Sequence, residues 1–224
     1  MTISHDTHEC DWFQLAMDGN VLACNDKWEL VNLVLPNQPR LKGTLAPEIG
    51  LLTSLRILDL QGNPKLKGSI PKQLGLLSNL EHLVLPNCGI SGILPTELGG
   101  LSMLQTLSLS NNINLGGYSL PTEMIRLTSL RDLQLQRTGL TGSIPEFLGK
   151  LSKLEWIDMS GNQLTGTIPV GLGMLRRLSE LNLHSNQLQG VIPSRMGRLR
   201  KLQYVNLANN QLTGTIPADQ LSYL

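Results

Sequence analysis

The sequence has few aromatic residues: its 224 positions include two Phe, three Trp and three Tyr. A core built from this chain must therefore be aliphatic, and 48 Leu residues supply the material for it. Hydrophobic residues make up 41% of the chain, which is enough for a packed core and excludes a wholly disordered chain.

The chain also lacks an excess of charge and any long apolar run. Eighteen basic and seventeen acidic residues give a net charge of +1, so we expect no general nucleic-acid binding, which needs a large cationic face. No apolar run approaches the roughly 18 residues that mark a membrane span. We therefore expect no membrane span within this chain.

Catalytic motifs are missing as well. The sequence contains no glycine-rich phosphate-binding loop, no His-Glu-x-x-His pair and no kinase catalytic loop. His5, His8, Glu9 and Cys10 carry donor atoms suited to a metal, but they lie in a short N-terminal tail, and we expect no metal site there. We predict no enzyme activity, no catalytic residue and no cofactor. Any kinase domain of the full-length protein would lie outside these residues.

An internal repeat dominates the sequence. A pair of apolar residues separated by one position recurs every 24 to 26 residues, at Leu33/Leu35, Leu58/Leu60, Leu83/Leu85, Leu107/Leu109, Leu133/Leu135, Ile157/Met159, Leu181/Leu183 and Val205/Leu207. The longer steps come from small insertions, such as the stretch 114–118. A fixed period with insertions at loop positions indicates a solenoid in which each repeat is one coil.

Each position of the repeat has a physical role. The cleanest copy reads Leu151-x-x-Leu154-x-x-Ile157-x-Met159-x-x-Asn162-x-Leu164-x-Gly166-x-Ile168-Pro169-x-x-Leu172-Gly173. The apolar-x-apolar pair predicts a short strand with one face in the core. The Asn that follows has an amide that can satisfy buried backbone groups of the neighbouring coil, and it recurs as a ladder at Asn63, Asn112, Asn162, Asn186 and Asn210. Gln38, Cys88 and Thr138 occupy the same column.

This unit resembles the leucine-rich repeat, and its Leu-x-Gly-x-Ile-Pro-x-x-Leu-Gly half resembles the plant-specific class of that family. The resemblance covers residues 29–224. It implies an α/β fold: a right-handed solenoid of about eight 24-residue repeats, shaped as a horseshoe or superhelix. The family places a parallel sheet on the concave side and 3₁₀ or short helical turns on the convex side. Its members include receptor-like kinases, receptor-like proteins and polygalacturonase inhibitors.

The two ends are interpreted from the same resemblance. Residues 1–28 resemble the family's N-terminal cap, in which we expect a disulfide between Cys10 and Cys24, with Trp12, Phe13 and Trp28 covering the first coil. Two reduced thiols are the alternative, and Cys88 is expected to be a buried thiol. Residues 29–224 form the repeats, the last of them incomplete and without a recognisable C-terminal cap. We expect the chain to be a fragment, with an open end that favours self-association.

Equivalent positions of successive repeats form columns on the concave face. The columns bring together an aromatic residue and charged or polar groups, the residue types enriched at binding hot spots. We predict ligand-binding residues at His82, Arg131, Asp132, Arg137, Trp156, Asp158, Glu180, His184 and Tyr204. The alternative is that these side chains merely solvate an exposed sheet.

The preferred interpretation is a recognition module that binds a peptide or protein ligand on the concave face, together with a co-receptor. The resemblance implies an extracellular or cell-surface receptor in signalling or defence, with the full-length protein anchored in a membrane. One alternative is a secreted inhibitor of the polygalacturonase-inhibitor type. Another is an intracellular scaffold in which all cysteines are reduced.

Overall fold

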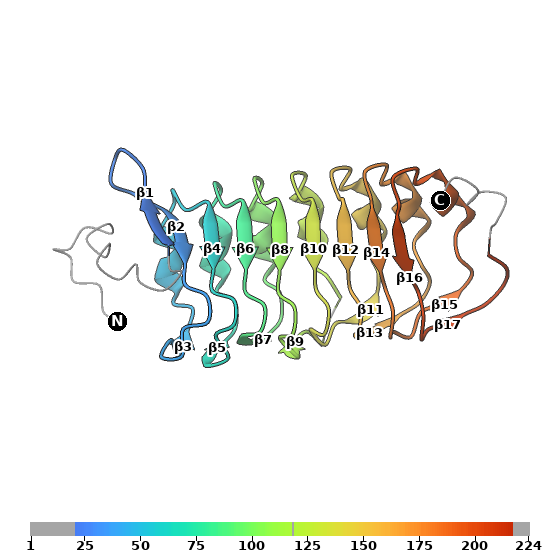
Figure 1. Ribbon diagram of the computed structural model, residues 1–224, viewed down its shortest axis with the longest axis horizontal. Helices are drawn as coiled ribbons and strands as arrows, with labels where there is room; N and C mark the ends of the chain where they lie inside the picture. The colour runs from blue at the N-terminus through green and yellow to red at the C-terminus, as the bar shows by residue number, and fades with distance from the viewer. Residues whose placement is uncertain (1–20, 118, 217–224) are drawn as a thin grey trace.

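The chain winds into an elongated stack of coils, each of which adds one strand to a long sheet (Figure 1). The computed structural model describes residues 21–117 and 119–216. The fold is the predicted solenoid, with a long sheet along one side and short 3₁₀ turns along the other. Residues 1–20 contain the tail His5–Cys10, Trp12 and Phe13, and the predictions about them lie outside the described residues.

The main sheet has nine strands in chain order. β1 pairs antiparallel with β2, and every later pairing in this sheet is parallel. The strands are β1 Val21–Cys24, β2 Leu30–Val34, β4 Ile57–Asp59, β6 His82–Val84, β8 Thr106–Ser108, β10 Asp132–Gln134, β12 Trp156–Asp158, β14 Glu180–Asn182 and β16 Tyr204–Asn206. Each parallel strand contains the outward residue between the two apolar residues of the predicted pair.

A second line of short strands runs along another edge of the stack. The sequence analysis did not predict these strands. These strands are β3 Gly43–Thr44, β5 Leu66–Gly68, β7 Gly89–Gly92, β9 Asn114–Leu115, β11 Thr141–Ser143, β13 Gln163–Thr165, β15 Gln189–Gly190 and β17 Gln211–Leu212. They come from the Leu-x-Gly part of each repeat and form three separate parallel sheets.

The 3₁₀ turns begin directly after the proline position of each repeat, which Ala46 occupies in the first. They are η2 Pro47–Leu51, η3 Lys72–Leu76, η4 Thr96–Gly100, η5 Thr122–Arg126, η6 Glu146–Lys150, η7 Val170–Met174 and η8 Ser194–Arg198. Glycine lets neighbouring turns approach closely: a Cβ at Gly173 would lie only 2.6 Å from the carbonyl oxygen of Arg195.

The core is a continuous aliphatic column between the sheet and the turns. Leu133 and Leu135 are both buried, while Gln134 between them faces outward, and the same alternation repeats along the stack. Trp28 does not cover the first coil as expected. Its side chain is 61% exposed in the β1–β2 turn, where the residue has a positive φ of 64°.

The ladder residues tie each coil to the one before it. Nδ2 of Asn162 donates to the carbonyl oxygens of Leu135 in the preceding coil (2.8 Å) and Met159 in its own (2.9 Å). Its Oδ1 accepts from the backbone N–H groups of Thr138 (3.0 Å) and Leu140 (3.1 Å). Amides at Asn63, Asn112, Asn186 and Asn210 donate in the same way. Each rung therefore satisfies buried backbone groups of two coils.

Substitution tests this role. We expect Asn162→Ala to lower the free energy of unfolding by about 3 kcal/mol, because it leaves the buried N–H groups of Thr138 and Leu140 without an acceptor and removes one of the two hydrogen bonds that the Leu135 and Met159 carbonyls each accept. The control is Asn79→Ala, since the exposed Asn79 amide donates a single hydrogen bond to the Thr53 carbonyl. It should cost no more than about 0.5 kcal/mol. Denaturant unfolding measures both, and equal losses would contradict the ladder's role.

Candidate ligand-binding face

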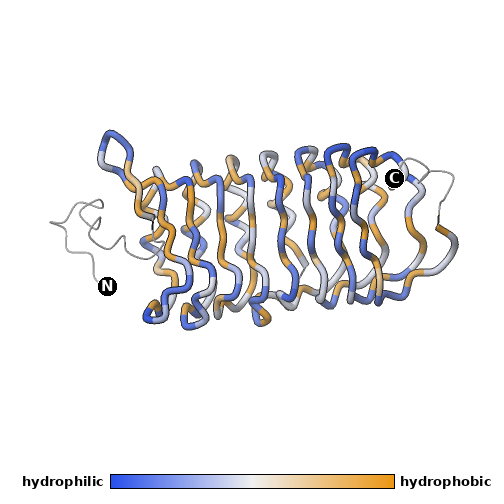
Figure 2. The backbone as a smooth tube through the Cα atoms, in the orientation of Figure 1, coloured by the Kyte–Doolittle hydropathy of each residue, from blue (hydrophilic) through white to orange (hydrophobic). Residues whose placement is uncertain are grey.

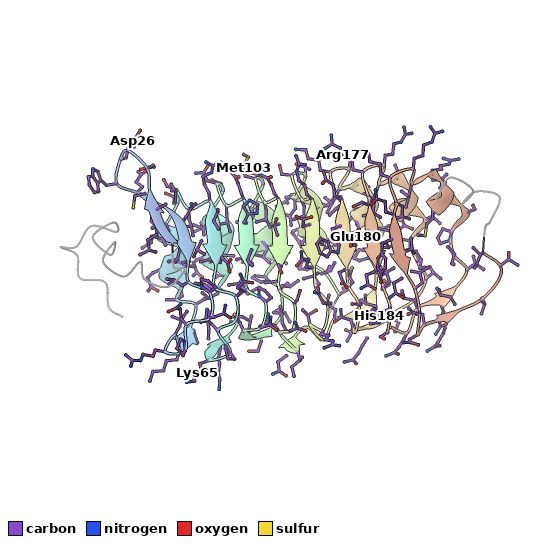
Figure 3. The ribbon with its side chains drawn as sticks, viewed as in Figure 1. Asp26, Lys65, Met103, Arg177, Glu180 and His184 are labelled. Atoms are coloured by element: carbon purple, nitrogen blue, oxygen red, sulfur yellow. The ribbon has the colours of Figure 1, made fainter. Side chains whose placement is uncertain are left out.

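The outward side chains of the main sheet form two rows, which we call the strand face. Register pairing places the first residues of successive strands side by side, and likewise the third residues. The first row is Ile57, His82, Thr106, Asp132, Trp156, Glu180 and Tyr204, and the second is Asp59, Val84, Ser108, Gln134, Asp158, Asn182 and Asn206. Glu180 lies in the C-terminal half of this face, on β14 (Figure 3).

A polar chain crosses three strands in the first row. His82 Nδ1 and Thr106 Oγ1 lie 3.0 Å apart, and the Thr106 hydroxyl donates to Asp132 Oδ2 at 3.3 Å. Burial raises the pKa of the Asp132 carboxyl, while the Thr106 hydrogen bond opposes that shift and the nearby Glu155 charge adds to it. The sequence analysis did not predict that Thr106 connects His82 to Asp132, although its position in the same column places it between them.

Asp158 in the second row is fully engaged within the protein. Its Oδ1 accepts from the backbone N–H (2.9 Å) and hydroxyl (2.6 Å) of Ser160, and its Oδ2 accepts from Asn182 Nδ2 (3.0 Å). His184 beyond the strand end is held by its neighbour, with Nδ1 2.8 Å from Ser185 Oγ. These groups form a hydrogen-bonded polar rim next to the first row.

Trp156, Glu180 and Tyr204 stand on three consecutive strands at register positions. The Trp156 side chain is 39% exposed and that of Tyr204 is 47% exposed. Asn206 Nδ2 donates to the Tyr204 hydroxyl at 3.2 Å, which holds the far end of the ring over its own strand. Among the described residues, the Glu180 carboxylate has no hydrogen-bond or ion-pair partner.

The two arginines of the predicted set lie beside this face. Arg131 directly precedes β10, and its guanidinium forms an ion pair with Glu155 at 3.0 Å. Arg137 follows the strand and has a φ of 54°. The equivalent position of every other described coil has the same left-handed conformation and is occupied by Asn37, Gly62, Asn87, Asn111, Gly161, Ser185 and Asn209.

The predicted set therefore divides by position. His82, Asp132, Trp156, Asp158, Glu180 and Tyr204 lie on strands of one sheet, whereas Arg131, Arg137 and His184 lie just outside the strand ends. The structure brings Trp156, Glu180 and Tyr204 together on neighbouring strands, while His82 lies two strands from Asp132.

Other features bear on the choice of function. Within residues 21–117 and 119–216, no group of three or more His, Cys, Asp or Glu side chains is arranged to hold a metal ion. No helix in the same part of the chain is long and apolar enough to span a membrane. Cys24 is disulfide-bonded, and the pairing with Cys10 stays a prediction because Cys10 lies outside the described residues. Cys88 is a free, buried thiol whose pKa is raised by burial.

Comparison with known proteins identifies the repeat. A family model described as a leucine-rich repeat region matches residues 40–215. No curated protein sequence matches the chain.

Similar solved structures include plant receptors. The ectodomain of the Arabidopsis thaliana membrane receptor kinase GASSHO1/SCHENGEN3, in complex with CASPARIAN STRIP INTEGRITY FACTOR 2, is 33% identical over 91% of this chain and 27% of that chain, with a TM-score of 0.73. The Arabidopsis receptor kinase HAESA, in complex with the peptide hormone IDA and the co-receptor SERK1, is 35% identical over 85% and 31%, with a TM-score of 0.81. The plant peptide hormone receptor RGFR1, in complex with RGF2, is 34% identical over 83% and 34%, with a TM-score of 0.70. The chain thus spans about a third or less of the length of these chains.

The raised pKa of Asp132 predicts a pH-dependent effect of substitution. The folded protein holds this proton more tightly than the unfolded chain, so the stability contributed by the protonated carboxyl is lost as pH rises through the folded pKa. We expect Asp132→Asn to raise the free energy of unfolding at about pH 7, and to leave it nearly unchanged below the ordinary Asp pKa of about 3.9. Unfolding titrations at both pH values measure the difference. A variant less stable than the wild type at neutral pH would contradict the prediction.

Arg137 provides a second stability test. A left-handed backbone costs a long side chain roughly 1 kcal/mol more than Asn or Gly. We expect Arg137→Asn to raise the free energy of unfolding by up to about 1 kcal/mol, since Asn already occupies this position in four described coils. Thermal unfolding monitored by circular dichroism measures the gain. Loss of stability would mean that the Arg137 side chain contributes more to packing than its backbone costs.

Proposed function

The chain belongs to the leucine-rich-repeat family, in its plant-type class, and from this premise we propose that it is a non-catalytic recognition module that binds a peptide or protein on its strand face. The family model covers residues 40–215, so the match extends over nearly the whole solenoid. Neighbours of similar fold are described in complex with a peptide hormone and, for HAESA, with a co-receptor. Peptide binding is the function that these likenesses favour, and we propose the strand face as its place.

The exposed Trp156 carries the proposal. Large aromatic side chains are normally buried, and Trp is the residue type most enriched at binding hot spots. Trp156 lies on the outer face of β12, the seventh strand of the nine-stranded sheet, while the inner face of that sheet is packed with buried leucines. Its ring therefore adds little to the core. Its neighbours in the row are Asp132 and Glu180, which supply charge beside an apolar surface.

We propose further that the module works outside the cell as part of a surface receptor in signalling or defence. The disulfide at Cys24 supports this location, because such bonds persist in oxidising compartments. A co-receptor would contact the same ligand from outside the strand face. The full-length protein would carry the membrane anchor.

The test is panning of a random peptide library on the purified chain, followed by affinity measurement on variants. We expect Trp156→Ala to weaken selected peptides by at least about tenfold, a loss typical of a hot spot, because the ring supplies the central apolar contact. Its melting temperature should stay within a few degrees of the wild type.

Trp28→Ala is the matched control, since it removes the same exposed ring from the β1–β2 turn, away from this part of the sheet. Equal weakening by both substitutions, or selected peptides that ignore Trp156→Ala, would overturn the strand-face assignment. A large loss of melting temperature in Trp156→Ala would instead place the ring in the core.

A further inference from the structure

We propose that Trp156, Glu180 and Tyr204 form a site for a single cationic side chain of the ligand, preferably the guanidinium of an arginine. The inference rests on the proposed function and adds the chemical class of the group that the strand face recognises. It follows from the register of three strands, the exposure of two rings and the unpartnered state of one carboxylate.

The register sets the size of the gap. Trp156 pairs with Glu180 and Glu180 pairs with Tyr204, so the two rings flank the carboxylate from the strands on either side. Neighbouring strands lie about 4.8 Å apart, which separates the two aromatic residues by about 10 Å. A cation above Glu180 would then lie about one strand spacing, or about 5 Å, from the strand that carries each aromatic residue, and a cation–π contact needs a ring centroid within roughly 6 Å.

The charge of the face favours a cation over any other group. β10, β12, β14 and β16 carry Asp132, Asp158 and Glu180 but no Lys or Arg. The nearby Arg131 is already paired with Glu155, so it does not neutralise Glu180. Both carboxylate oxygens of Asp158 already accept hydrogen bonds, from Ser160 and Asn182. Asp132 accepts a hydrogen bond from the Thr106 hydroxyl, so Glu180 is the carboxylate on these four strands that has no hydrogen-bond or ion-pair partner within the part of the chain that the structure describes.

Arginine fits this site better than lysine or a metal ion. Its planar guanidinium can lie between two rings and still offer a fork of N–H donors to the carboxylate. A metal ion would need several oxygen ligands, whereas the described site presents one carboxylate between two aromatic rings.

The other strongly charged surface of the molecule is separate from this site. Arg176, Arg177, Arg195, Arg198, Arg200 and Lys201 are all exposed in the turns of the last coils. Figure 3 shows Arg177 on the edge of the stack, away from Glu180 on the strands. Figure 2 shows the same edge as a hydrophilic band. None of these cations forms an ion pair with the Glu180 carboxylate, but the same basic surface of a second copy of the chain could bind it, and the test must separate that outcome.

The probes are two blocked peptides, acetyl-Gly-Arg-Gly-amide and its citrulline counterpart, which keeps the shape of arginine without its charge. We expect the arginine peptide to bind about tenfold more tightly, measured by the NMR shift of the Trp156 indole N–H. Glu180→Gln should abolish this preference, and Tyr204→Leu should reduce it several-fold. Added salt should weaken the arginine peptide alone.

Glu97→Gln is the matched control, because it removes the same charge from the exposed turn η4 without touching the strand face. Its affinity for the arginine peptide should stay within about twofold of the wild type. Equal binding of the two probes, or equal weakening by Glu97→Gln and Glu180→Gln, would overturn the site. If the chain self-associates and Glu180→Gln abolishes that association, then Glu180 binds the basic surface of a second copy. This result would also overturn the proposed ligand site.

The library experiment separates this inference from the proposed function. Selected peptides that need Trp156 but carry no enriched basic residue, and that bind Glu180→Gln unchanged, would refute the cation site and leave peptide recognition standing. A library that yields no binder dependent on Trp156 would refute both. Enrichment of arginine on the wild type that disappears on Glu180→Gln would support both.

Discussion

The structure depends on one repeated interaction, the side-chain amide that bonds to the backbone of two successive coils. A coil of this size cannot close its own hydrogen bonds, because its turns expose carbonyls and N–H groups to an apolar interior. Asn162 satisfies four of these groups at once, and its equivalents repeat the arrangement along the stack. In two coils Thr138 and Cys88 replace Asn and can form fewer hydrogen bonds. Thr138 donates to a carbonyl through its hydroxyl, and Cys88 donates to a carbonyl through its thiol.

This arrangement separates stability from recognition. The leucine columns and the ladder lie inside the coil, whereas the two rows of the strand face belong to neither. A side chain in those rows can therefore change its chemistry without removing a core contact. Such positions are occupied by Trp156, Glu180 and Tyr204. An aromatic–acid–aromatic row can therefore lie on the surface of a protein whose core is aliphatic.

Much of the fold could be predicted from the sequence because the repeat imposes it. The apolar pairs predicted the strands, the ladder Asn identified the turn after each strand, and the resemblance predicted 3₁₀ or short helical turns on the opposite side. The start of each turn, directly after the proline position, is seen only in the structure. The short strands of the second edge were missed, because strands of two to four residues are too short to show an alternation of their own. Trp28 was placed wrongly, since an aromatic residue near a cap suggests burial but the β1–β2 turn directs it outward.

The candidate site was predictable as columns but not as contacts. The period alone put Asp132, Trp156, Glu180 and Tyr204 in one row. The Thr106 link and the engagement of Asp158 depend on rotamers that no pattern specifies. The left-handed backbone at Arg137 was also hidden, because it becomes visible only when the coils are aligned in space and Arg stands where Asn or Gly is usual.

The uniform strand spacing of the sheet has a consequence for any extended chain laid across it. Strands repeat about every 4.8 Å, while an extended peptide advances about 3.3 Å per residue. Two strand intervals therefore match about three peptide residues, but side chains of an extended peptide alternate between its two faces, so residues three apart point in opposite directions. The ligand would present a side chain to the sheet in the same way only after about six residues, which corresponds to about four coils.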